Sequence, residues 1–186
     1  MIYNTIVIGG GPSGLFTAIS IGENSTLLLE KNMQLGRKLL IAGSGRCNFT
    51  HSGLINDFFS HYGSNGKFLK CALKELSNTD LIDFFNKYGL KAIEDNNGKI
   101  FPHTNSSSDI LSILLSVCKN LNITIKSNAS VIGVSKNANL FSVITNGGTY
   151  NCKNLVIATG GFSYPVTGST GDGYAFVLEL WRTECW

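Results

Sequence analysis

β-Branched and apolar residues form two short runs near the start of the chain, at residues 5–8 and 26–29, and each run begins with a threonine. Neither run shows the polar alternation of a half-exposed strand, so each predicts a strand that is buried on both faces of a parallel sheet. Small and apolar residues at 15–21 lie between the two runs and predict a helix. Residues 1–30 therefore predict a strand–helix–strand unit with parallel strands.

The remaining pattern predicts helices first and strands afterwards. Apolar residues recur at helical spacing in residues 67–76, 79–88 and 106–121, and a last helix is expected from residue 171. Asn78 is the expected N-cap of the second of these helices. Short strands are expected at residues 90–94, 99–101, 123–125, 129–135, 140–145, 149–152 and 155–158. Residues 31–50 follow neither period and are predicted to form a long ordered loop.

Glycines follow the first predicted strand in the spacing G-x-G-x-x-G, at Gly9, Gly11 and Gly14. The first allows a sharp turn, the second lets backbone approach a pyrophosphate, and the third lets the helix pack close to the strand. Pro12 suits the first helical turn, and Ser13 adds a hydroxyl beside N–H groups that can bind an anion. Because a strand precedes this motif and a helix comes after it, we interpret it as a dinucleotide-binding turn.

Glu30 follows the second predicted strand directly. A carboxylate at this place accepts hydrogen bonds from the ribose hydroxyls of an adenosine. It also repels a 2′-phosphate, so NADP is disfavoured here.

The composition is that of an ordinary globular protein: 186 residues, 43% hydrophobic and 15% charged, with a net charge of +3. Scattered basic residues and a small net charge argue against nucleic acid or an anionic membrane as a partner. The five cysteines contain no C-x-x-C pair, which favours reduced thiols in a cytoplasmic protein. We expect no metal site, no transmembrane helix and no signal peptide.

Three antiparallel strands, at residues 129–152, precede the buried strand that ends in Ala158, Thr159, Gly160 and Gly161. Such a meander is typical of FAD-binding oxidoreductases, whereas NAD-binding domains usually have helical crossovers at this place. The expected fold class is therefore α/β, an FAD-binding Rossmann-like parallel sheet with a three-stranded antiparallel meander.

Four blocks of the sequence together resemble the HI0933-like (aminoacetone-oxidase-type) family of FAD-dependent flavoproteins. The blocks are residues 7–15 (VIGGGPSGL), 36–50 (GRKLLIAGSGRCNFT), 98–111 (GKIFPHTNSSSDIL) and 155–176 (LVIATGGFSYPVTGSTGDGYAF). The first block and the A-T-G-G segment occur in many flavoproteins. The G-S-G-R-C-N and S-Y-P-V-T-G-S-T-G-D-G-Y-A segments are more specific and carry the resemblance.

The resemblance implies one FAD-binding domain over residues 1–186, with a flavin-side loop and helical region at 31–121 and a β-meander at 128–152. Family members are longer, with an inserted second domain and a C-terminal return. Because residues 180–186 do not resemble the family's sequence at this place, we expect the N-terminal part of an incomplete domain.

The expected cofactor is FAD, held by nineteen residues, while the catalytic residues stay unknown. These residues are Gly9, Gly11, Pro12, Ser13, Gly14, Glu30, Lys31, Arg37, Lys38, Gly45, Arg46, Cys47, Asn48, Val131, Ala158, Thr159, Gly160, Gly161 and Asp172. Within this set, Arg46 and Asn48 are expected at the flavin and Val131 at the adenine.

Four of these assignments have structural alternatives. Lys31 is either on the adenine side or a solvated surface lysine, and Arg46 either contacts the flavin or pairs with an acid. Cys47 is either a redox thiol activated by its basic neighbour or, as we favour, a small residue packed near the flavin. Asp172 either contacts FAD or caps the last helix.

The expected function is that of an FAD-dependent oxidoreductase, which transfers two electrons between a small-molecule substrate, or a reduced nicotinamide, and an acceptor. The alternative is a nucleotide-binding module without catalytic activity, because the substrate half is absent. A flavoprotein that modifies RNA is a third possibility, and the weak charge argues against it.

Overall fold

The computed structural model describes residues 1–22 and 25–184. The chain forms two compact units: unit 1 comprises residues 1–39 and 114–186, and unit 2 comprises residues 40–113. The chain leaves unit 1 within helix α2 and returns to it within helix α6.

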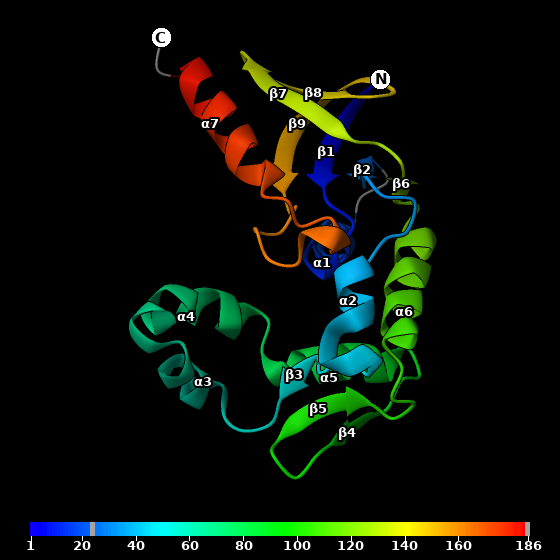
Figure 1. Cartoon of the computed structure of the whole chain (residues 1–186), viewed down its shortest axis with the longest axis vertical. Helices are drawn as coiled ribbons and strands as arrows, with labels where there is room; N and C mark the ends of the chain where they lie inside the picture. The colour runs from blue at the N-terminus through cyan, green and yellow to red at the C-terminus, as the bar shows by residue number, and fades with distance from the viewer. Residues whose placement is uncertain (23–24, 185–186) are drawn as a thin grey trace. The chain divides into compact units, whose positions relative to one another are not determined.

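The helices are α1 (Pro12–Ile21), α2 (Arg37–Ile41), α3 (Ile55–His61), α4 (Gly66–Glu75), α5 (Asn78–Lys87), α6 (Ser107–Asn120) and α7 (Asp172–Glu184) (Figure 1). The strands are β1 (Ile2–Ile8), β2 (Thr26–Leu29), β3 (Thr50–His51), β4 (Ala92–Glu94), β5 (Lys99–Pro102), β6 (Thr124–Lys126), β7 (Val131–Asn137), β8 (Leu140–Thr145) and β9 (Gly148–Ile157). Short 3-10 turns occur at Ala42–Gly45, Gly63–Asn65 and Pro165–Thr167.

Unit 1 is built on a six-stranded sheet in the order β6-β2-β1-β9-β8-β7. The first four strands in that order are parallel, and β9, β8 and β7 pair antiparallel. The expected α/β class is confirmed, with a parallel sheet and an antiparallel meander.

One strand replaces two that the sequence predicts separately. Residues 149–152 and 155–158 are expected as the end of the meander and as an independent buried strand, but both lie in the ten-residue strand β9, apart from Ala158 just after its end. Its first part pairs with β8 and its later part pairs with β1, with a short overlap at residues 151–152. The polar residues between the two apolar runs therefore continue the strand and do not break it.

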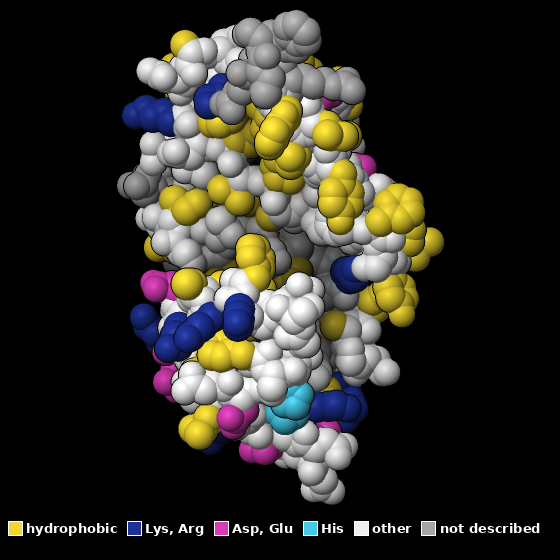
Figure 2. Space-filling view, turned by 90° about the vertical axis from the view of Figure 1, so that its left-hand side faces the viewer, with side chains coloured by type: hydrophobic (Ala, Val, Ile, Leu, Met, Phe, Trp, Pro, Cys, Tyr) yellow, Lys and Arg dark blue, Asp and Glu magenta, His cyan; other side chains and the backbone are white. Residues whose placement is uncertain are grey.

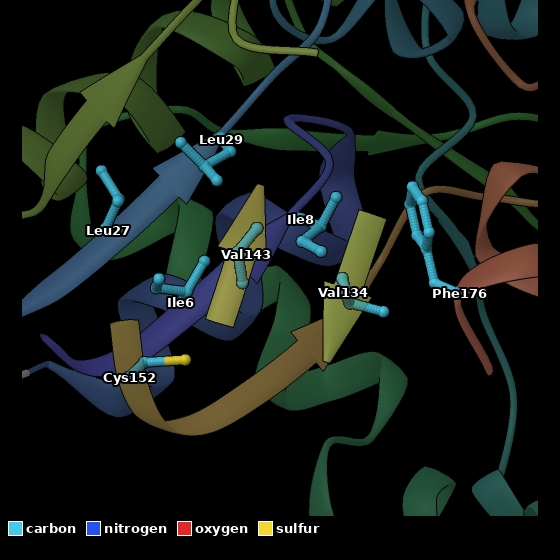
Figure 3. Close-up of a cluster of buried hydrophobic side chains, with 8 residues drawn as sticks. All are labelled: Ile6, Ile8, Leu27, Leu29, Val134, Val143, Cys152 and Phe176. Carbon is cyan, nitrogen blue, oxygen red and sulfur yellow. The ribbon is translucent and has the colours of Figure 1, made fainter. Parts of the chain in front are cut away.

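The core of unit 1 lies where this sheet meets helix α7. Figure 3 shows the buried side chains of Ile6, Ile8, Leu27, Leu29, Val134, Val143, Cys152 and Phe176. The phenylalanine comes from α7 and the others from five strands of the sheet. All four residues of β2 and the last four of β1 are buried, as the uninterrupted apolar runs predict.

Unit 2 contains a small antiparallel sheet, in the order β3-β5-β4, with helices α3, α4 and α5. Helix α3 is not predicted from the sequence, and the predicted loop at residues 31–50 contains α2, the first 3-10 turn and the start of β3. Ser77, and not Asn78, is the N-cap of α5, because its hydroxyl accepts from the N–H of Asp80. Asn78 is buried instead, and its amide donates to the carbonyls of His51 and Gly53, both at 3.0 Å.

Candidate cofactor site

A pocket opens at the carboxyl ends of β1, β2 and β9, all within unit 1. The carboxyl edge of a parallel sheet is where α/β folds bind their ligands. The residues that line the pocket are Ile8, Gly9, Gly11, Pro12, Ser13, Leu29, Glu30, Lys31, Asn32, Gln34, Gly36, Arg37, Lys38, Ala129, Val131, Ala158, Thr159, Gly160, Thr167, Gly168, Ser169, Asp172 and Phe176.

The three glycines of the first motif have different surroundings. Gly9 has φ +112°, and a Cβ there would meet the carbonyl oxygen of Ala158 on the neighbouring segment. A Cβ on Gly14 would meet the carbonyl oxygen of Gly9, so this glycine allows α1 to pack against the turn. A Cβ on Gly11 would meet no atom within 4 Å and would project into open space. Since Gly11 lines the pocket, its missing side chain leaves room for a ligand.

The N-terminus of α1 lies at the same place. Its N-cap is Gly11, which provides no side-chain hydrogen bond, and the first turn contains no acidic residue. Pro12 occupies the first helical position, where its missing N–H costs little. The backbone N–H groups of this turn and the positive end of the helix dipole are thus available to an anion.

Glu30 is 8% exposed, and both of its carboxylate oxygens are engaged. One oxygen accepts from the N–H of Gly10 at 2.7 Å. The other accepts from the N–H of Asn32 at 2.8 Å and from its amide nitrogen at 2.6 Å. A carboxylate has about four acceptor positions, so these bonds orient the group and leave capacity for a ligand hydroxyl.

Lys31 and Asp172 form an ion pair at the edge of the pocket. The ammonium lies 2.7 Å from a carboxylate oxygen of Asp172 and 2.5 Å from the hydroxyl of Thr170. Burial by itself raises the pKa of Asp172, but hydrogen bonds from Lys31 and Thr170 outweigh it and lower that pKa below its ordinary value of 3.8. Lys31 is therefore not a free surface lysine, and the pair joins the end of β2 to the start of α7.

Two further basic side chains of the pocket are held by neighbours. Arg37 donates to the amide oxygen of Asn32 at 2.9 Å. Lys38 donates to the hydroxyl and the carbonyl of Ser163 at 2.6 and 3.0 Å, and lies 5.8 Å from the ring centre of Tyr164. These bonds fix the cations along the rim of the pocket.

Several pocket residues were not predicted from the sequence, namely Asn32, Gln34, Gly36, Thr167, Gly168 and Ser169. Gly168 has φ +102°, and a Cβ there would lie 2.6 Å from the amide nitrogen of Asn32. A signal for it is present in the sequence, because the glycine and its neighbours belong to the family-specific segment at 163–175.

Thirteen of the predicted site residues line the pocket and six do not. Gly14 lies behind it as a packing residue, and Gly161 follows the lining segment. Gly45, Arg46, Cys47 and Asn48 belong to unit 2.

The unit 2 residues are engaged within their own unit. The guanidinium of Arg46 lies 4.5 Å from the ring centre of Phe101. With its amide oriented to donate, Asn48 contacts the carbonyls of Thr50 at 2.7 Å and Ile100 at 3.2 Å. Cys47 is 1% exposed with φ +61°, and burial raises the pKa of its thiol to about 11. A buried thiol of high pKa is a poor nucleophile, which supports the packing role that we favour.

The pocket matches the adenosine and pyrophosphate parts of FAD. Three features lie together in the pocket lining. They are the N-terminus of α1, which has no side-chain cap, Gly11, whose Cβ would meet no atom within 4 Å, and the buried carboxylate of Glu30. Among the described residues, no group of three or more His, Cys, Asp or Glu is placed to hold a metal ion. No helix in the described part of the chain is long and apolar enough to cross a membrane.

Curated relatives cover nearly the whole chain. It is 35% identical over 180 residues to a ribosomal RNA dihydrouridine synthase of Escherichia coli, an alignment that covers 96% of this chain and 44% of the relative. It is 28% identical to a 3-dehydro-bile acid delta(4,6)-reductase of Clostridium scindens over 95% of this chain and 44% of the relative. The chain therefore spans less than half the length of these relatives.

Solved structures support the fold alone. An open flavocytochrome c3 fumarate reductase aligns with a TM-score of 0.63 and 18% identity, over 87% of this chain and 34% of that chain. THI4 of Thermovibrio ammonificans aligns with a TM-score of 0.54 and 13% identity, over 85% of this chain and 57% of that chain.

Residues 3–182 match the family described as HI0933-like protein Rossmann domain. The chain therefore belongs to the HI0933-like family.

Proposed function

We propose that the unit 1 pocket binds the adenosine and pyrophosphate of FAD, and that the whole protein is an FAD-dependent reductase. The observation that carries the proposal is the convergence of the α1 N-terminus, Glu30 and the Ala158–Gly160 segment in one pocket. These groups lie far apart in the sequence, and the parallel strands bring them to one edge of the sheet.

In this proposal, each side of the pocket holds one part of the cofactor. The N–H groups at Gly11, Ser13 and Gly14 bind the pyrophosphate. Glu30 accepts from a ribose hydroxyl through the position that its three protein donors leave open. Val131 lines the pocket at the start of β7 and contacts the adenine.

Arg46 and Asn48 remain proposed contacts of the flavin. Both side chains are oriented within unit 2, by the ring of Phe101 and by two backbone carbonyls. The fixed guanidinium of Arg46 suits the polar edge of a flavin, where a cation stabilises the reduced form. Both N–H groups of the Asn48 amide are taken up by carbonyls, so Asn48 offers its amide oxygen as an acceptor.

The reaction class is inferred from the names of two relatives. Dihydrouridine is uridine with a saturated ring double bond, and a delta(4,6)-reductase also saturates carbon–carbon double bonds. The flavin supplies the two-electron transfer when it is bound. The proposed reaction adds a hydride and a proton across a double bond conjugated to a carbonyl, and a reduced nicotinamide is the source of the electrons.

Uridine in RNA is the first substrate to test, because the relative that is 35% identical is named a ribosomal RNA dihydrouridine synthase. An RNA substrate disagrees with the expectation from the sequence that the protein has no nucleic-acid partner. That expectation rests on a net charge of +3 and remains a prediction.

A visible spectrum of the purified chain tests the cofactor. We expect flavin bands near ~370 and ~450 nm, which are general to flavins. A colourless chain that also fails to bind added FAD would refute the pocket assignment. Anaerobic NADH or NADPH then tests electron transfer: bleaching supports the reductase, whereas bound FAD that stays oxidised with both donors supports a nucleotide-binding module.

A further inference from the structure

Helices α3 and α4 form a hairpin in unit 2 that buries very little of its own surface. Among all residues of α3, α4 and the 3-10 turn between them, only Gly66 is buried. A Cβ on Gly66 would meet the carbonyl oxygen of Phe59, so this glycine lets the two helices approach. The partly buried Leu69 and Leu73 mark the packed side of α4. The opposite side of α4 is exposed.

Three lysines lie on this exposed side, namely Lys67, Lys70 and Lys74, and we call them the α4 lysine face. Their spacing of three and four residues places them in one row along the helix. The row is about 10 Å long at ~1.5 Å per residue. Figure 2 shows exposed Lys and Arg side chains, with Asp and Glu side chains near them, on the side of the molecule that is on the left in Figure 1.

The ammonium groups of the α4 lysine face are not engaged by the protein. Within residues 1–22 and 25–184, none of the three forms a hydrogen bond, ion pair or ring contact. The pocket lysines differ, because Lys31 pairs with Asp172 and Lys38 donates to Ser163. The α4 row therefore presents three neighbouring cations whose charges are open to an external anion.

The hairpin also exposes two aromatic side chains. Phe68 follows Lys67 and is 86% exposed, and Tyr62, just before α4, is 47% exposed. Phe68 is about 100° from Lys67 around the helix, at one side of the α4 lysine face, and its exposed ring offers a flat surface on which a nucleobase can stack. The acidic residues of the hairpin are Asp57 and Glu75, one near the start of α3 and one at the end of α4.

We propose that the α4 lysine face and Phe68 dock single-stranded RNA, which brings the RNA substrate of the proposed function to the protein. The three ammonium groups of the row supply three positive charges for the phosphates of one strand. The ring of Phe68 supplies the stacking platform. An anionic membrane is the alternative partner, because lysines next to an exposed phenylalanine also suit a membrane surface. RNA is favoured here because the substrate of the proposed function is a uridine in RNA.

Fluorescence anisotropy with a labelled uridine-rich RNA of about 12 nucleotides, within the site sizes of single-strand binding proteins, tests the docking face. Binding is measured between about 50 and 200 mM NaCl for the unchanged chain and for the triple variant Lys67→Gln, Lys70→Gln and Lys74→Gln. We expect at least ~10-fold weaker binding and a salt slope that is smaller by about 2, from ~0.7 per lost phosphate contact.

A second triple variant, Lys87→Gln, Lys91→Gln and Lys99→Gln, is the matched control. These lysines are exposed in the same unit and their replacement removes the same charge, but they lie on α5, before β4 and on β5. We expect less than a twofold change in RNA affinity. Equal weakening by both triple variants would refute a specific face and leave only general charge attraction.

Phe68→Ala separates stacking from charge. We expect RNA affinity about 10-fold weaker with an unchanged salt slope, because the substitution removes a stacking surface and no cation. Circular dichroism and melting of each variant confirm that it folds. An RNA affinity insensitive to both Phe68→Ala and the α4 triple variant would overturn the proposal.

Two further readouts keep the proposals apart. Sedimentation with phosphatidylserine–phosphatidylcholine vesicles tests the membrane alternative, and vesicle binding without RNA binding contradicts the docking proposal. The flavin spectrum is recorded in parallel. A chain that binds FAD and no RNA contradicts the docking face alone, whereas a chain that binds RNA and no FAD contradicts the cofactor pocket alone.

Discussion

Two glycine-rich turns of this protein look alike in sequence and differ in structure. Residues 9–14 form the turn before α1 in unit 1, and residues 43–48 form a turn in unit 2. In the first turn, Gly11 faces open space, and its helix has no side-chain cap. In the second turn, a Cβ on Gly43 would lie 2.9 Å from the backbone nitrogen of Asn48.

The second turn is also folded tightly upon itself. Gly43 and Ser44 both adopt left-handed backbone conformations, with φ +57° and +58°, and so does Cys47 at +61°. The N–H groups of Arg46 and Cys47 donate to the carbonyls of Gly43 and Ala42. A glycine can thus leave space for a ligand or allow its own chain to turn, and only the surroundings distinguish the two roles.

Gly11→Val should have the largest effect on cofactor binding. The side chain would enter the open space beside Gly11, so we expect FAD affinity to fall more than ~100-fold while apo stability changes by ~1 kcal/mol or less. Isothermal titration and thermal melting measure the two quantities. The control is Gly147→Val, outside the pocket, where the nearest atom to a Cβ is the Thr145 hydroxyl at 4.0 Å. Unchanged FAD affinity in Gly11→Val would refute the geometry of the site.

Gly43→Ala should instead destabilise the fold. Alanine at φ +57° carries backbone strain, and its Cβ would also press on the Asn48 nitrogen, so we expect a loss of ~2–3 kcal/mol in unfolding free energy. The matched control is Gly63→Ala, with φ +56° and no atom within 4 Å of a Cβ. The control should lose only the strain, about 1–2 kcal/mol. If urea unfolding gives the same loss of unfolding free energy for Gly43→Ala and Gly63→Ala, the contact with Asn48 does not contribute to the destabilisation.

Glu30→Gln tests the acidic wall of the pocket. The neutral amide keeps the shape but loses charge-assisted acceptance, so we expect FAD binding weaker by ~1–2 kcal/mol, or roughly 5- to 30-fold. Glu179→Gln is the control, because its carboxylate also accepts a backbone N–H, from Val134 at 3.0 Å, outside the pocket lining. If both variants lose FAD affinity equally, the effect is one of stability and not of contact with the ribose.

Asp172→Asn should have the smallest effect, since its side chain is 36% exposed and solvent screens the pair with Lys31. The folded-state pKa of Asp172 lies below its ordinary value of 3.8, so its ionised form stabilises the fold above that pH. We expect the variant to lose ~0.5 kcal/mol at about pH 7. The difference should vanish as the pH falls below 3.8 through the folded pKa. A difference that stays constant across this whole pH range would exclude the ion pair as its cause.

Local patterns determined much of unit 1. The uninterrupted apolar runs predicted β1 and β2, and the glycine spacing predicted the turn before α1, because these features depend on neighbouring residues alone. The continuity of β9 was not predicted, because its polar middle resembles a loop until β8 and β1 pair with the strand on either side. Helix α3 has apolar residues at helical spacing, Ile55, Phe58 and Phe59, but it is only seven residues long, so the pattern covers too few turns to identify a helix.

The sequence alone determined the family and the α/β fold class, since motif spacing and residue type carry that information. Only the tertiary structure decided which charged side chains form ion pairs or hydrogen bonds within the protein and which do not. Lys31 and Asp172 are 141 residues apart and pair through the fold, whereas the α4 lysines find no partner among the described residues. Such pairing depends on distances between segments remote in the chain, which a local pattern does not encode.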